Sequence, residues 1–183
     1  MTSGSDGVEP GITPDAKDWT WVLSRPCPQC GFDAAQVHPT DVGGQVVQDA
    51  HHWVARLREP GATVRPAPSV WSPLEYGCHV RDVHRIFNHR IQLMLNEHEP
   101  TFPNWDQDET ALAENYGAQD PIAVADELLD AATTVAETYA SVPADAWPRR
   151  GLRSNGSEFT ISSIARYHLH DVVHHAWDVS PRP

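Results

Sequence analysis

The chain has 183 residues, a mass of 20.3 kDa and a net charge of −12, from 25 acidic and 13 basic residues. This acidity argues against nucleic acid and anionic membranes as partners, because both require a basic face on the protein. The length and the hydrophobic fraction of 40% suit a single domain with one core. No apolar run approaches the roughly 20 residues that span a bilayer. The start carries no signal-peptide pattern, so we expect a cytoplasmic protein.

The N-terminal part divides into an arm and a cysteine-containing segment. Residues 1–17 are rich in Gly, Ser, Pro and Asp, and we expect a flexible arm before a single domain over 18–183. Cys27 and Cys30 form a C-x-x-C pair, which is half of a structural zinc site, and His38 is a candidate third ligand. The alternatives are a redox pair, for which the βαβ context is absent, and a turn with two small buried thiols.

Four helices are predicted by apolar residues that recur at spacings of three and four. Their expected ranges are about 42–58, 73–96, 121–141 and 160–179. Ser72 before Pro73 and Asp120 before Pro121 give clear starts, since both pairs place a capping side chain before a proline. The acidic segment 100–116 is expected to be a loop, and Asn-Gly at 155–156 predicts a short hairpin before the last helix.

The last helix holds four of the eleven histidines, between positions 168 and 175. Two pairs have members four residues apart, Asp171 with His175 and His170 with His174. Either pair could hold a divalent metal. Asp171 and His175 lie on or next to the apolar stripe, so they are the first choice and His170/His174 the alternative. Without a metal, the helix would simply carry one buried histidine among solvated ones.

A third ligand is expected on the second helix. His79 lies one turn before Val83, so it should face the interior, where the last helix offers two more ligands. The alternative is a core histidine that binds no metal. His84, His89 and His98 have no such position relative to the apolar stripe and are expected on the surface.

Two motifs resemble those of the DinB-like superfamily. Residues 71–82 (WSPLEYGCHVRD) resemble W-[ST]-x-x-E-x-x-x-H-x-x-D, and residues 171–179 (DVVHHAWDV) resemble [HE]-x-x-H-H-x-x-[QHD]-[IVL]. The resemblance covers about 42–179 and implies an all-α, YfiT-like four-helix bundle. Here the bundle would have a short hairpin before the last helix and an irregular N-terminal segment. It also implies zinc or nickel held by His79, Asp171 and His175. Asp171 replaces the usual His or Glu, which keeps His170/His174 open as the alternative pair.

The superfamily includes bacillithiol- and mycothiol-dependent transferases and a mycothiol-dependent maleylpyruvate isomerase branch. The resemblance therefore implies a metal-dependent enzyme that conjugates or isomerises small electrophiles with a low-molecular-weight thiol such as mycothiol. Asp82, His174 and Asp178 are candidates for groups that orient the metal-binding imidazoles. The alternative is a non-catalytic metal-binding or stress-associated bundle, dimeric through a helix face.

Overall fold

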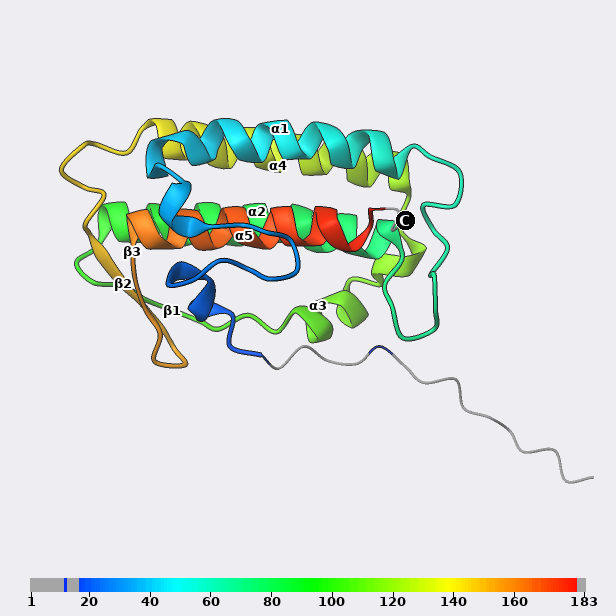
Figure 1. The fold of residues 1–183 in the computed structure, drawn as a ribbon, viewed down its shortest axis with the longest axis horizontal. Helices are drawn as coiled ribbons and strands as arrows, with labels where there is room; N and C mark the ends of the chain where they lie inside the picture. The colour runs from blue at the N-terminus through cyan, green and yellow to red at the C-terminus, as the bar shows by residue number, and fades with distance from the viewer. Residues whose placement is uncertain (1–11, 13–16, 181–183) are drawn as a thin grey trace, which may run out of the picture.

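The computed structural model describes residue 12 and residues 17–180 (Figure 1). The arm expected over 1–17 therefore lies almost entirely outside the described residues. None of the helices in the described part is long and apolar enough to cross a membrane.

Four long helices form the body of the molecule. They are α1 (Val42–Leu57), α2 (Pro73–Asn96), α4 (Pro121–Ala140) and α5 (Ile161–Asp178). In Figure 1, α1 and α4 run side by side in one layer and α2 and α5 in the other, with their buried faces between them. The four predicted helices are confirmed, with ends that differ by at most one residue from the expected ranges.

The helix starts follow from local capping chemistry. Ser72 and Glu75 form a capping box at the start of α2, in which each side chain binds the other residue's backbone N–H. Thr160 and Ser163 do the same at the start of α5, and the Asp120 side chain accepts from the Ile122 N–H before α4. These bonds satisfy N–H groups that have no partner inside the helix, which fixes where each helix begins.

A small sheet lies at one end of the bundle (Figure 1). The predicted hairpin is confirmed, because β2 (Arg150–Arg153) pairs antiparallel with β3 (Glu158–Thr160). The expectation of a plain loop over 100–116 is wrong. This segment contains β1 (Thr101–Phe102), which pairs parallel with β2, and the short helix α3 (Gln107–Ala113). The fold is therefore mostly helical rather than purely all-α.

The N-terminal segment packs along α5. It contains three short 3-10 helices, Thr20–Leu23, Ala34–Gln36 and Pro39–Asp41. The Arg166 side chain of α5 donates from Nε to the carbonyl of Val37 at 2.9 Å. This packing holds the cysteine-containing loop against α5.

The prediction that His84 lies on the surface is wrong. His84 is fully buried, and its Nδ1 lies 2.9 Å from Nε2 of His168. The other nitrogen of His168, Nδ1, lies 2.9 Å from the hydroxyl of Tyr139. His84 follows Val80 by four residues and precedes Phe87 by three, which is a core-facing position on the helix. His89 and His98 are exposed, as predicted.

Candidate metal centre

Three side chains from two facing helices converge at the inner side of α5. His79 of α2 places Nε2 3.4 Å from Oδ1 of Asp171, and Nε2 of His175 lies 3.6 Å from the same oxygen. One ligand atom from each of the three lies within 4.8 Å of the others. Bonds of about 2.1 Å at tetrahedral angles place ligand atoms about 3.4 Å apart, so the spacing suits a divalent cation.

The polar atoms of this group also fit a cation. His79 is fully buried, and among the described residues neither of its ring nitrogens has a hydrogen-bond partner. Oδ1 of Asp171 is likewise buried without a hydrogen bond in the described part of the chain. Buried polar atoms without partners cost free energy, and a cation among them would compensate this cost. His79, Asp171 and His175 therefore fit a metal as a donor set.

The charge states of His79 and Asp171 also match those of metal ligands. Burial lowers the pKa of His79, and Asp171 opposes this only in part. Burial raises the pKa of Asp171, but the neighbouring His79 and His175 outweigh it and hold this pKa well below its usual range. A neutral imidazole and an ionised carboxylate are the forms that bind metal.

Asp178 orients one of the imidazoles. Its Oδ2 lies 3.0 Å from Nδ1 of His175, so Nδ1 carries the proton and Nε2 is left to face Asp171. Asp82 is placed differently, because its carboxylate accepts hydrogen bonds from Arg81, Arg85 and the Tyr116 hydroxyl. Asp82 therefore acts on His79 through its charge and not through a hydrogen bond.

Aromatic rings enclose the buried imidazole. The ring of Trp105 stacks on His79 with centroids 5.2 Å apart and an angle of 7° between the planes. Trp71 lies on another side of the same ring, with centroids 5.6 Å apart. These rings limit the access of water to His79 and fix the plane of its imidazole.

A cavity of about 630 Å³ opens beside the centre, and Asp171 and His175 line it. The sequence analysis did not single out two of its other lining residues, Arg90 and Arg153. Both side chains are almost fully buried, and neither forms an ion pair with a carboxylate of the described residues. Burial, together with the nearby charge of Arg153, lowers the pKa of Arg90 to about 10. The two guanidinium groups place positive charge in one part of a cavity wall that also carries Asp18, Asp106, Asp108, Asp171 and Asp178.

Asp49 of α1 was also missed by the sequence analysis. Its side chain is nearly buried, and burial raises its pKa to about 7, while the charge of His175 acts in the opposite direction. Its position between Val46 and Trp53, on the buried stripe of the first helix, could have predicted a buried carboxyl. Asp49 does not line the cavity, so it is a buried carboxyl of the core whose charge interacts with His175.

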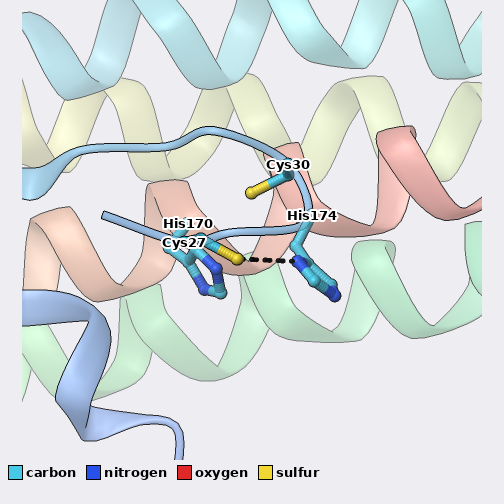
Figure 2. A group of neighbouring side chains, drawn as sticks. All are labelled: Cys27, Cys30, His170 and His174. Carbon is cyan, nitrogen blue, oxygen red and sulfur yellow. Dashed lines mark hydrogen bonds between the residues drawn. The ribbon is translucent and has the colours of Figure 1, made fainter. Parts of the chain in front are cut away.

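The alternative pair, His170 and His174, does not belong to the group around His79, although both side chains line the same cavity as Asp171 and His175. Instead, these two side chains and the pair Cys27 and Cys30 have ligand atoms within 4.8 Å of one another (Figure 2). His38 does not take part, because it is exposed and its Nδ1 lies 2.7 Å from the Thr40 hydroxyl. Burial raises the pKa of the Cys30 thiol to about 11, while the backbone N–H of Phe32 acts in the opposite direction.

Comparison with known proteins identifies the family. The sequence profile of the DinB superfamily matches residues 45–179. The chain belongs to the DinB superfamily. No functionally curated protein sequence matches it.

Two solved structures of similar fold support this DinB assignment. One is YfiT from Bacillus subtilis, described as "a probable metal-dependent hydrolase with an unusual four-helix bundle topology". It has a TM-score of 0.60 and 15% identity, over 74% of this chain and 81% of YfiT. The other is a mycothiol-dependent maleylpyruvate isomerase, with a TM-score of 0.60 and 13% identity, over 80% of this chain and 62% of the isomerase. At these identities the two structures establish the shared DinB fold.

Proposed function

We propose that this DinB protein is a divalent-metal-dependent enzyme that acts on small electrophiles with a low-molecular-weight thiol of the mycothiol type. The enzyme either conjugates the thiol to the electrophile or uses the thiol to isomerise it. The observation that carries the proposal is the position of Asp171 and His175, which belong to the three-residue donor set and also line the open cavity. Small molecules can therefore reach the metal position. Zinc is the first choice of metal for a His/Asp/His set and nickel the second.

A divalent cation held by His79, Asp171 and His175 would lower the pKa of a thiol or water bound to it, so that a nucleophile exists at neutral pH. The remaining work falls to the chain itself. Asp178 holds the tautomer and orientation of His175 through the 3.0 Å contact with Nδ1. Trp105 excludes water from the far side of His79.

The two buried arginines indicate the kind of electrophile. Nη2 of Arg90 donates to the carbonyl of Pro103 at 3.2 Å, and Arg153 donates to the side chains of Asn155 and Ser157. These bonds hold both guanidinium groups at the cavity wall while leaving other N–H groups of each for a ligand. A substrate with a carboxylate would neutralise this region, so we propose an acidic electrophile such as an unsaturated dicarboxylate.

Metal content and turnover together test the proposal. The purified chain should contain stoichiometric metal. It should consume an unsaturated dicarboxylate in the presence of mycothiol faster than with cysteine or with no thiol. His79→Asn and Asp171→Asn should abolish turnover, whereas His52→Asn, which changes an exposed histidine of α1, should not. Bound metal without turnover over a panel of thiols would favour the non-catalytic bundle, and thiol-independent ester or amide cleavage would favour a hydrolase.

The dimethyl ester of the same dicarboxylate tests the role of the arginines. Arg90→Gln should raise KM for the diacid by about tenfold or more, because a charge-assisted hydrogen bond contributes about 1.5–3 kcal/mol. KM for the ester, which carries no charge, should change little. An equal effect on both substrates would show that Arg90 supports the fold and does not bind the carboxylate.

A further inference from the structure

The second group of side chains joins parts of the chain that are 140 residues apart or more. Cys27 and Cys30 belong to the N-terminal loop, and His170 and His174 lie one turn apart on α5. In Figure 2 the loop passes across α5, and the two sulfur atoms and two imidazoles meet on the outer side of that helix. We propose that Cys27, Cys30, His170 and His174 form a structural zinc site, separate from the centre at His79.

The chemistry and spacing of the four groups fit zinc. Two thiolates and two imidazoles are a standard donor set for structural zinc, which is four-coordinate and tetrahedral. Sγ of Cys27 lies 3.6 Å from Nδ1 of His174. Zinc bonds of about 2.3 Å to sulfur and about 2.0 Å to nitrogen, at tetrahedral angles, separate the two atoms by about 3.5 Å, close to the observed distance. Nε2 of His170 is buried and has no hydrogen-bond partner among the described residues.

The loop between the cysteines has the compact turn that such a site requires. The N–H of Gly31 donates to the carbonyl of Cys27 at 2.9 Å, and the N–H of Cys27 donates to the carbonyl of Phe32 at 2.8 Å. Gly31 has a φ of +75°, a conformation that residues with a side chain rarely adopt. The turn brings both sulfurs to the same side of the loop, within reach of one ion.

Aromatic side chains shield the four groups from water. Trp19 contacts both imidazoles, with ring centroids 5.6 Å from His170 and 4.9 Å from His174. Phe32 meets the edge of His170 at 5.4 Å. The cysteine residues are buried or half-buried, and His170 and His174 are nearly buried. His170 and His174 also line the cavity, but four protein ligands fill a tetrahedral coordination sphere and leave no position for substrate, which is typical of structural zinc and not of catalytic zinc.

The site would fasten the N-terminal segment to α5 and thereby complete the cavity. Lys17, Asp18, Trp19 and Gln29 all belong to this segment and line the cavity beside the first centre. Zinc bound at the second site would hold this wall in place, because the ligands on the loop are joined directly to those on α5. The two sites would therefore have different roles, one chemical and one structural.

Cobalt substitution tests the proposal without any mutation. The full chain, reduced and loaded with Co²⁺, should show a thiolate-to-cobalt charge-transfer band in the near ultraviolet and the intense visible bands of tetrahedral cobalt. X-ray absorption at the zinc edge should detect sulfur at about 2.3 Å. A spectrum with nitrogen and oxygen neighbours alone would overturn the site, even if no variant folds.

Adjacent residues of α5 supply matched variants. His174→Asn should remove one equivalent of zinc and the sulfur signal, whereas His175→Asn should remove one equivalent and keep that signal. Cys27→Ser should behave like His174→Asn. The control Cys78→Ser, which changes a distant buried cysteine, should keep both zinc equivalents and the sulfur signal. If Cys27→Ser retains all its zinc, or if the native cysteines form a disulfide under mild oxidation with zinc present, the proposal fails. Loss of metal in His79→Asn or His175→Asn concerns only the proposed active centre, so failures of the two proposals are distinguishable.

Discussion

The buried histidine pair His84 and His168 should make the fold sensitive to mild acid. Burial lowers the pKa of His168 from 6.5 to about 3, and it lowers that of His84 well below the same starting value. Both side chains are therefore neutral in the folded chain but become protonated in the unfolded chain as the pH falls below 6.5. Stability is then highest above this pH and is lost as the pH decreases, because the unfolded state binds more protons.

The size of the effect follows from the two pKa values of His168. With 6.5 in the unfolded chain and about 3 in the folded chain, lowering the pH from 7 to 5 reduces the free energy of unfolding by about 2 kcal/mol. His168 is fully buried, so solvent does not screen the effect. His84 acts in the same direction and adds to the loss.

Urea unfolding at pH 7 and at pH 5 measures this loss. His168→Gln should lose about 2 kcal/mol less than the wild type between the two pH values, although it is less stable at pH 7. The metal ligands titrate in both proteins, so their contribution cancels in the difference. His52→Gln, which removes an exposed histidine, is the control and should follow the wild type. An identical pH dependence for His168→Gln and the wild type would show that His168 is not a source of the acid sensitivity.

Three further predictions concern stability and metal retention. Gly151→Ala should destabilise the fold by about 1–3 kcal/mol in urea unfolding, because its Cβ would lie 2.8 Å from Cγ of Met94 and 2.9 Å from Cε1 of Phe102. Ser72→Ala should cost about 1 kcal/mol by the same measurement, since it removes the capping bond at the start of α2. Trp105→Ala should speed the release of metal to a chelator with little loss of helix content by circular dichroism, because it exposes the stacked face of His79; an unchanged rate would contradict this.

The sequence predicted the bundle well because its helix boundaries depend on local chemistry. Ser72, Asp120 and Thr160 stand directly before the three helices that they were expected to start. The pairing of β1 with β2 was not predictable in this way. Its partners, such as Thr101 and Leu152, are about 50 residues apart, and a two-residue strand has no periodicity.

The two histidine-containing pairs of α5 could not be assigned from sequence. Asp171/His175 and His170/His174 were predicted as alternatives for one metal. Each step along a helix turns the side chain by about 100°, so pairs offset by one residue point in different directions. The structure places one pair against α2 and the other against the N-terminal loop. Only the position of that loop, which depends on tertiary packing, reveals what the second pair contacts. The burial of His84, in contrast, could have been predicted, since its helical spacing from Val80 and Phe87 was visible in the sequence.

Under the proposed function, the small sheet would separate selectivity from chemistry. Arg153 belongs to β2, and the guanidinium of Arg90 lies 5.1 Å from the Phe102 ring of β1, so the positive end of the cavity rests on the strands. The proposed metal-binding donor set belongs to α2 and α5. A change in the length or sequence of the hairpin between β2 and β3 could therefore alter which acids are accepted while leaving the reactive centre intact. Relatives that share the helices but differ at these strands should share a reaction type and diverge in substrate.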